Sequence, residues 1–467
     1  MFAAIRKSFA LFALSFPVLA HSAEVVTTEQ ATALRAQLRV QEDSPGLRHA
    51  LELSNDLRSW TAYPLSFDQE QGAWSVQADG QVAIFAASDR GDGSWSIDFE
   101  TLLDDAVFLR IAPLAGPFPA DSTVTEETRH LLQNLHRLGW DAERFAFGQE
   151  FPLSYNSTDN IGNGDIDQSE SKDVVGDHPG VHGADFLYMI DRSWEEHFHI
   201  AAAKRAYESG AIVTFDYHWA GKYGGDYKAH PQDDTLLDYV VRNDDSRGDV
   251  TWFYESLDRI LAIINDELQF PIVFRPFHEM DGNWFWWGRQ MQGGADTYRQ
   301  AYRLLVEYLS ARTDYVLFCW SPDVALEDFE QFYPGDAYVD IVGRDIYNIT
   351  DPGRPLSKLT EMIDFAAARG KVAALTETGY ARGGSFETGD PDWWTTHILD
   401  PIVADEKAGK IAWVLTWINA SWSGPYIPRS TSPQAAKDDF KAFYESPATL
   451  FQSEVAALNV YAPPASE

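Results

Sequence analysis

The stretch "FRPFHEMDGNWFWWG", residues 274–288, places His278 and Glu279 at the end of a short apolar run and follows them with three tryptophans. A second glutamate, Glu377, stands near the end of the apolar segment that begins at Lys371. A pair of facing carboxyl groups can hydrolyse a glycosidic bond, one as nucleophile and the other as acid and then base. Either glutamate alone would suit an ion pair equally well. The chemical argument therefore rests on the pair and on the aromatic side chains around it.

The segments that must position these residues alternate between strand and helix. Amphipathic stretches such as 194–208 and 297–311 predict helices between most of the predicted strands. This alternation predicts an α/β fold, a (β/α)8 TIM barrel, in which polar residues at the carboxyl ends of the strands form the active site. The strands are predicted at residues 144–150, 185–191, 211–219, 271–279, 315–323, 339–347, 371–379 and 411–419.

The chain divides into four predicted parts. Residues 1–23 carry Arg6 and Lys7, an apolar stretch and then small residues, which is typical of a signal peptide of a secreted or periplasmic protein. Residues 25–118 show short alternating runs with Trp60, Trp74 and Trp95 and predict a small all-β accessory domain. The barrel is expected at 125–450, with a C-terminal tail at 451–467.

Composition narrows the range of partners. The chain has 36 Lys+Arg against 71 Asp+Glu, a formal charge of -35, which repels nucleic acid and anionic membranes. Aromatic residues make up 14% of the chain, including 16 tryptophans, and flat rings suit the C–H faces of neutral sugars. A single cysteine, Cys319, excludes an intramolecular disulfide. Composition therefore favours a neutral sugar as the ligand. We also expect the protein to be a monomer.

The order and spacing of four motifs carry a family resemblance. "RPFHEMDGNWFWWG", followed by "GRDIY", "TETG" and "VLTWIN", resembles glycoside hydrolase family 26, the secreted retaining β-mannanases, over about residues 125–450. The resemblance implies that Glu279 is the acid/base, that Glu377 is the nucleophile and that His278 orients the pair. The family often has Asn where this chain has Asp281.

Further roles follow from position and from the resemblance. Arg275, four residues before the proposed acid, is expected near Glu377, where it favours the charged form of that glutamate. Tyr347 is placed to hydrogen-bond Glu377. An apolar wall of Trp284, Phe285 and Trp286 is expected to disfavour ionisation of Glu279. The predicted substrate-binding residues are His218, Trp219, Trp284, Asp345 and Trp417.

The remaining aromatic residues separate into two groups. Tyr227 and Trp422, like Trp219, fall in predicted rim loops and are candidate sugar platforms. Trp287 and Trp413 fall on the inward phase of apolar segments, which favours core packing.

The sequence indicates no cofactor and no required metal. Residues 159–170 partly resemble a calcium loop, but Ile161 stands where a third-position ligand is needed.

The function expected from the resemblance is an endo-β-1,4-mannanase that cleaves mannan, glucomannan or galactomannan with retention. Two alternatives stay open: a β-1,3-1,4-glucanase or β-1,3-xylanase of the same family, and a carbohydrate-binding barrel without catalysis.

Overall fold

The computed structural model describes residues 119–121, 123–140, 144–157, 166–349, 356–380 and 386–464, together with the backbone of seven strands between residues 34 and 113. The chain forms two compact units, Met1–Gly116 and Pro117–Glu467. The predicted signal peptide and most of the calcium-like loop lie outside the described residues.

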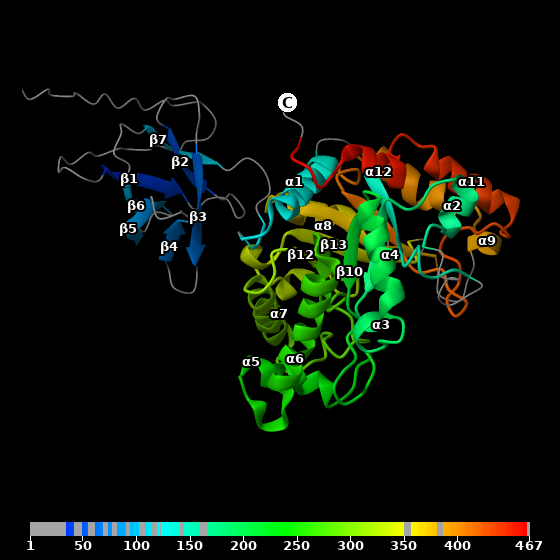
Figure 1. The fold of residues 1–467 in the computed structure, drawn as a ribbon, viewed down its shortest axis with the longest axis horizontal. Helices are drawn as coiled ribbons and strands as arrows, with labels where there is room; N and C mark the ends of the chain where they lie inside the picture. The colour runs from blue at the N-terminus through cyan, green and yellow to red at the C-terminus, as the bar shows by residue number, and fades with distance from the viewer. Residues whose placement is uncertain are drawn as a thin grey trace, which may run out of the picture. The chain divides into compact units, whose positions relative to one another are not determined.

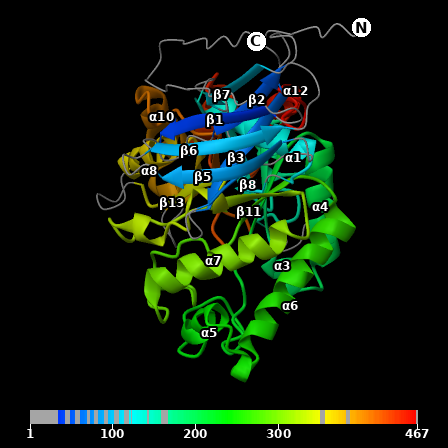
Figure 2. The same ribbon diagram turned by 90° about the vertical axis from the view of Figure 1, so that its left-hand side faces the viewer.

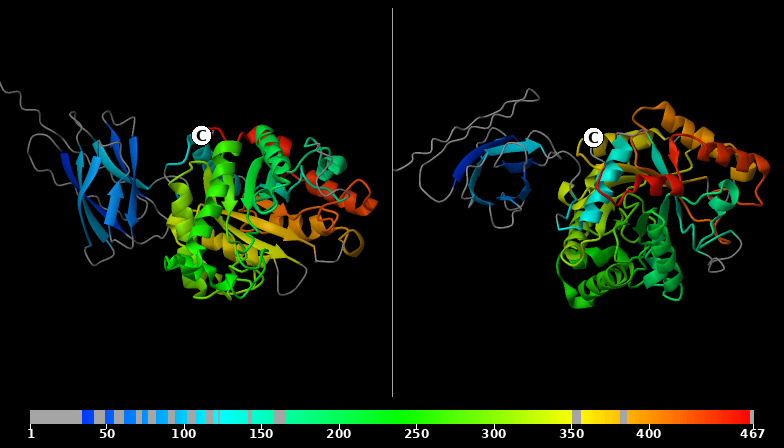
Figure 3. Two further views of the ribbon diagram at one scale, coloured as in Figure 1. Left: turned by 60° about the horizontal axis from the view of Figure 1, so that its bottom comes forward. Right: turned by 45° about the horizontal axis from the view of Figure 1, so that its top comes forward.

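The first unit contains antiparallel strands in two sheets (Figure 3). One sheet has the order β1-β6-β5 and the other β4-β3-β2-β7. The prediction missed β1 and β3, although the β1 sequence LRAQLRVQ alternates strictly between apolar and polar residues. That this first unit is an accessory domain remains a prediction. The strands are β1 (Leu34–Gln41), β2 (His49–Ser54), β3 (Thr61–Asp68), β4 (Ala73–Val76), β5 (Val82–Asp89), β6 (Ser94–Thr101) and β7 (Phe108–Pro113).

The second unit is a closed parallel barrel, as the sequence predicts. Neighbouring strands from β8 to β15 pair in parallel, and the pairing of β15 with β8 closes the ring. A closed sheet has no exposed edge, and its strands all end at one rim. The strands are β8 (Phe145–Glu150), β9 (Val181–Asp185), β10 (Ile212–Asp216), β11 (Ile272–Arg275), β12 (Val316–Trp320), β13 (Ile341–Tyr347), β14 (Val372–Gly379) and β15 (Trp413–Thr416).

Helices run along the outside of the barrel strands (Figure 1, Figure 2). They bury one apolar face each; α7, for example, buries Tyr298, Tyr302 and Leu305. Within the described part of the chain, no helix combines the length and apolar character needed to cross a bilayer. The α-helices are α1 (Glu126–Trp140), α2 (Glu170–Val175), α3 (Leu187–Ile190), α4 (Glu196–Glu208), α5 (Leu236–Val241), α6 (Asp249–Ala262), α7 (Gly294–Ser310), α8 (Ser357–Ala367), α9 (Phe386–Gly389), α10 (Asp400–Ala404), α11 (Gln434–Tyr444) and α12 (Gln452–Leu458).

The predicted second barrel strand was wrong. The strand is Val181–Asp185, and the apolar run after it forms the short helix α3. His182 and Gly183 interrupt the apolar pattern of this strand, and a Cβ atom at Gly183 would lie 2.4 Å from Oε1 of Glu150. The buried carboxyl of Glu150 thus takes the space that an apolar side chain would fill.

The predicted C-terminal tail was also wrong. Residues Thr449–Leu450 form β16, which pairs with β8, and α12 follows directly. Phe451, Val455 and Val460 are buried, so this segment is part of the barrel unit.

Successive residues of a strand face opposite sides of the barrel wall. On β11, Phe274 belongs to the same apolar cluster as the helix residue Phe253, whereas Val273 belongs with Leu317 to a separate cluster. Arg275 follows in the same phase as Val273, which directs it away from the helices and toward the inside of the rim. The predicted core positions Trp287 and Trp413 are both buried, as expected.

Candidate active site

The carboxyl ends of the strands bring Glu279 and Glu377 together. Glu377 lies on β14, and Glu279 lies in the turn that follows β11. One oxygen of each glutamate lies within 4.8 Å of the other. Retaining glycosidases separate their two carboxyl groups by about 5–5.5 Å, and inverting enzymes by about 6.5–9.5 Å. The observed spacing fits retention.

The turn after β11 holds Glu279 in an uncommon backbone conformation. Phe277 and Glu279 both have positive φ angles, 51° and 52°. Such a conformation costs about 1–3 kcal/mol for each residue and tends to occur at functional sites. The backbone N–H of Glu279 donates to the carbonyl of Ser321 at 2.9 Å, which fixes the turn against the end of β12.

Both glutamates line a cavity of about 1070 Å³. The predicted residues His218, Trp284, Tyr347 and Trp417 line it too, as do the candidate platforms Tyr227 and Trp422. This volume exceeds that of a typical small-molecule pocket, about 300–1,000 Å³, and has room for several sugar units.

Glu377 is held by two donors. The Arg275 guanidinium donates to one carboxylate oxygen, and the Tyr347 hydroxyl donates to the other at 2.7 Å. Arg275 also bonds Asp345 at 2.7 Å and Asp216 at 3.1 Å. Burial lowers the pKa of Arg275, but its carboxylate neighbours outweigh burial and hold that pKa well above the usual value. Arg275 therefore remains a cation beside Glu377.

Glu279 has the opposite surroundings. Burial raises its pKa well above the usual value, and the charges of Glu377 and Asp323 raise it further. The Trp284 indole N–H donates to Oε2 of Glu279 at 2.6 Å, which opposes this rise by favouring the anion. Glu279 is thus protonated at a pH at which an exposed glutamate would be ionised.

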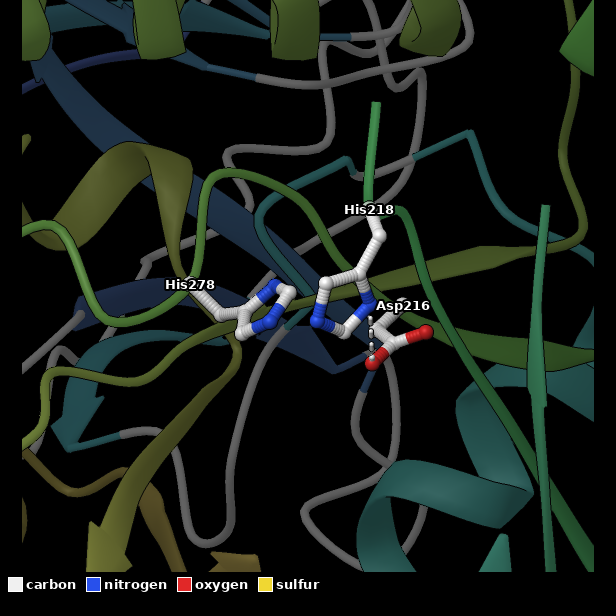
Figure 4. Close-up of side chains that lie close together, drawn as sticks. All are labelled: Asp216, His218 and His278. Carbon is white, nitrogen blue, oxygen red and sulfur yellow. Dashed lines mark ion pairs between the residues drawn. The ribbon is translucent and has the colours of Figure 1, made fainter. Parts of the chain in front are cut away.

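Two histidines, His278 and His218, lie close to the catalytic pair. The Nε2 atom of His278 lies 4.0 Å from Oε1 of Glu377, and neither ring nitrogen of His278 has a hydrogen-bond partner. Burial lowers the pKa of His278 well below the usual value, and Arg275 and His218 lower it further, so the ring is neutral. His278 packs edge-on against His218, with ring centroids 4.6 Å apart (Figure 4). His278 can therefore donate to Glu377 after a small movement.

Comparison with known proteins agrees with this geometry. Residues 120–422 match the profile of Glycosyl hydrolase family 26. The chain belongs to this family. It is 30% identical over 369 residues to a mannan endo-1,4-beta-mannosidase of Bifidobacterium adolescentis, a match that covers 72% of this chain and 35% of that protein. It is 26% identical to a mannan endo-1,4-beta-mannosidase of Bacillus subtilis, covering 58% of this chain and 76% of the relative.

A solved structure extends the family 26 comparison to the fold. The catalytic domain of an endo-beta-1,4-mannanase from Bacillus sp. JAMB-750 superposes with a TM-score of 0.66 at 27% identity. The match covers 74% of this chain and 96% of that domain. The chain thus spans nearly all of a family 26 catalytic domain but about a third of the Bifidobacterium relative.

Two residues predicted to bind substrate, Trp219 and Asp345, are buried instead of exposed to the cavity. Trp219 is 2% exposed and stacks in the core on Phe277 and Phe253. Asp345 is fully buried and accepts hydrogen bonds from Arg275 and Thr376. Neither residue lines the cavity. Trp219 is therefore a packing residue, and Asp345 a positioning residue for Arg275.

The predicted apolar wall around Glu279 is smaller than expected. Trp284 and Phe285 line the cavity, but Trp286 is fully buried and its indole N–H donates to the carbonyl of Trp219.

Asp281 has a structural role that the sequence left undefined. Its carboxyl accepts backbone N–H groups of Asp323, Ala325 and Leu326, so it ties the loop after β12 to the turn that carries Glu279. Burial raises the pKa of Asp281 to about 7.

The sequence interpretation missed three buried carboxyl groups. Glu150, Asp185 and Asp216 each end a barrel strand, the same positional signal that identified the other site residues. Asp185 holds the proposed sugar-binding residue His218 through Nδ1 at 3.0 Å, and Asp216 bonds Arg275.

Two groups of side chains in the described residues resemble metal ligand sets. Asp216, His218 and His278 offer donor atoms within 4.8 Å of one another (Figure 4), as do Glu279, Asp345 and Glu377. In both groups Arg275 already donates to a carboxylate, Asp216 in the first and Glu377 in the second. A bound cation would lie against that guanidinium, and the two positive charges would repel each other. The absence of a required metal remains a prediction.

Proposed function

We propose that this family 26 protein is an endo-β-1,4-mannanase that hydrolyses internal bonds of mannan, glucomannan or galactomannan with retention. The observation that carries the proposal is the pair Glu279 and Glu377, with oxygens within 4.8 Å of each other and opposite electrostatic surroundings. The names of the curated relatives supply the substrate class.

In the first step, Glu377 attacks the anomeric carbon while Glu279 donates its proton to the leaving oxygen. Arg275 and Tyr347 donate to the two oxygens of the Glu377 carboxylate and orient it for the attack. The glycosidic bond breaks as the bond to Glu377 forms, and the leaving sugar departs as an alcohol. The step needs a carboxyl group that keeps its proton, and the raised pKa of Glu279 meets that need.

In the second step, Glu279, now ionised, removes a proton from a water molecule that attacks the same carbon. The bond to Glu377 breaks, and the product keeps its β configuration after two inversions. His218, Trp284 and Trp417 line the cavity beside these groups and would hold the sugars on either side of the cleaved bond.

The test is a product profile on mannan, glucomannan, lichenan and β-1,3-xylan, combined with the anomeric configuration of the first product. An endo-β-1,4-mannanase lowers the viscosity of mannan quickly while few reducing ends appear, and releases β product. Preference for lichenan or β-1,3-xylan would assign one of the alternative specificities. Binding without hydrolysis of any of the four would assign a non-catalytic barrel.

We also propose that the protein is exported and acts as a monomer on extracellular β-mannan. The charged start, apolar stretch and small residues of positions 1–23 support export, with cleavage after Ala20 or Ala23. N-terminal sequencing of protein recovered outside the cytoplasm tests the cleavage site, and light scattering tests the monomer.

A further inference from the structure

A second cavity lies apart from the catalytic one, between β9 and the helices that cover it. It measures about 280 Å³, and among the described residues it shares no lining residue with the catalytic cavity. Ligand pockets usually measure about 300–1,000 Å³, so this cavity suits a small molecule rather than a sugar chain. Its walls include His182 of β9, Lys172 of α2, Arg205 of α4 and Gln452 of α12.

His182 occupies a position that a parallel barrel strand usually gives to an apolar side chain. Ala184, two residues further along β9, belongs to the apolar cluster that includes the helix residue Ala203, so His182 in the same phase faces the helices. His182 is 1% exposed, and neither of its ring nitrogens has a hydrogen-bond partner among the described residues.

The unpartnered imidazole offers a donor to the cavity. Burial lowers the pKa of His182 to about 3, so the ring is neutral and one of its nitrogens carries an N–H. A buried donor without a partner destabilises the protein. A ligand that accepts a hydrogen bond from this N–H would remove that cost.

Two cations share the cavity with His182. The Nζ of Lys172 donates to the carbonyl of Asp167 at 2.7 Å. Arg205 donates from NH1 to the hydroxyl of Ser209 at 2.9 Å and from Nε to the Asp167 carboxylate, which does not line the cavity. An ammonium has three donors and a guanidinium five, so both cations keep further N–H groups for a ligand.

The carboxylate in the described cavity wall, Asp177, is already engaged by other donors. Its Oδ1 accepts the backbone N–H of His178, and its Oδ2 accepts both the backbone N–H and the hydroxyl of Ser453. These donors offset its charge, so Lys172 and Arg205 dominate the field in the cavity. Positive charge of this kind disfavours a metal cation and favours an anion, on a chain whose formal charge is -35.

We propose that this cavity binds a small oxyanion, such as phosphate or a carboxylate, through Lys172, Arg205 and His182. Lysine and arginine donate charge-assisted hydrogen bonds to such oxygens, and the neutral imidazole adds a further donor. A bound anion would connect β9 with α2 and α4, so it should stabilise the folded barrel. Binding does not depend on the proposed hydrolysis, because the two cavities have separate walls.

The first test measures thermal unfolding of the full chain in sodium phosphate, sulfate, acetate or chloride at equal ionic strength. An oxyanion at about ten times its Kd should raise the Tm by about 1–3 °C above that in chloride. A larger shift in phosphate or sulfate would indicate a tetrahedral ligand, and a larger shift in acetate would indicate a carboxylate. The same Tm in all four salts would overturn the site.

Variants separate binding in the cavity from the general stabilisation that phosphate and sulfate give by exclusion from protein surfaces. Isothermal titration calorimetry with inorganic phosphate, or with acetate if acetate stabilises more, measures Kd. Arg205→Ala should raise Kd by about 10- to 100-fold, the contribution of a hydrogen bond to a charged group. Lys172→Met should raise it as well. The matched control is Lys204→Ala, because this neighbouring cation of α4 pairs with Glu267 and does not line the cavity; its Kd should equal that of the wild type.

The absence of saturable binding to the wild type would overturn the site, as would an equal Kd in the wild type, Arg205→Ala and Lys172→Met. A Kd that rises as much in Lys204→Ala as in Arg205→Ala would also overturn it, because binding would then follow the overall charge of α4. Lys172 and Arg205 lie on different helices, so each variant tests the site on its own.

Discussion

Replacing Trp284 by phenylalanine removes one hydrogen bond from the proposed acid while it keeps an aromatic ring at that position. The indole N–H donates to the Glu279 carboxylate at 2.6 Å, and this bond favours the anion. A hydrogen bond to a charged group contributes about 1.5–3 kcal/mol, and about 1.36 kcal/mol corresponds to one pH unit. Glu279 is buried, so solvent screens this interaction little.

The variant should therefore have its basic pH limit displaced upward. Activity requires protonated Glu279 and is lost as pH rises through the pKa of this group, so without the N–H the basic limb of kcat/KM should move to higher pH by about one to two pH units. The assay is kcat/KM on a manno-oligosaccharide between pH 4 and 10, a range of about six pH units that spans both limbs of a bell-shaped profile.

The matched control is Trp422→Phe, which removes an indole N–H from the same cavity. Its basic limb should stay in place. A basic limb in Trp284→Phe that is unmoved or displaced to lower pH would refute the assignment of Glu279 as the acid held by Trp284. A lower kcat/KM at every pH would reflect weaker sugar stacking. The pH at which the basic limb falls would still decide the test.

Three further predictions follow from the same geometry. Glu377→Ala should form no glycosyl-enzyme, whereas Glu279→Ala should still form it from a substrate with an activated leaving group, which needs no proton. Mass spectrometry of the trapped protein checks both variants. A glycosyl adduct in Glu377→Ala on the residue that carries it in the wild type would show that the nucleophile is another residue. Treatment with EDTA should leave mannan hydrolysis unchanged, because Arg275 supplies the positive charge beside Glu377; loss of activity that calcium restores would contradict this. Trp219→Ala should destabilise the fold by about 3–5 kcal/mol because it empties a core position, and denaturant unfolding measures this; a small effect together with a raised KM would return Trp219 to the substrate.

The barrel and most of the site could be predicted from sequence because the strands repeat one pattern. An apolar run that ends in a polar residue marks a strand and also its functional end, as in "IVFRPFHE" and "ALTE". The second strand, Val181–Asp185, escaped prediction because His182 and Gly183 interrupt the apolar pattern where the Glu150 carboxyl needs room. A packing requirement between two strands cannot be read from one of them.

The misplaced roles have a similar origin. Trp219 follows His218 in sequence, but its side chain faces the core while His218 faces the cavity. The two neighbouring side chains point in different directions. The backbone after β10 is irregular, so no strand period is available from which to predict those directions. Asp345 likewise lies on the correct rim but below the cavity, where Arg275 occupies its carboxylate. The sequence identifies which residues lie at the carboxyl ends of the strands. Whether such a residue faces the cavity or is buried beneath it depends on its contacts with neighbouring strands.

The charge of Glu377 itself couples the two steps of the proposed reaction. Next to burial, the Coulombic effect of Glu377 is the largest influence that raises the pKa of Glu279. While Glu377 is an anion, it keeps Glu279 protonated, which is the form that the leaving group needs. Bonding of Glu377 to the sugar converts its carboxylate to a neutral ester and removes that charge. The pKa of Glu279 then falls just after the group has given up its proton, so its anion is stabilised and can act as the base for water. Because the oxygens of the two glutamates lie within 4.8 Å of each other, the state of the nucleophile sets the role of the acid without any movement of the chain.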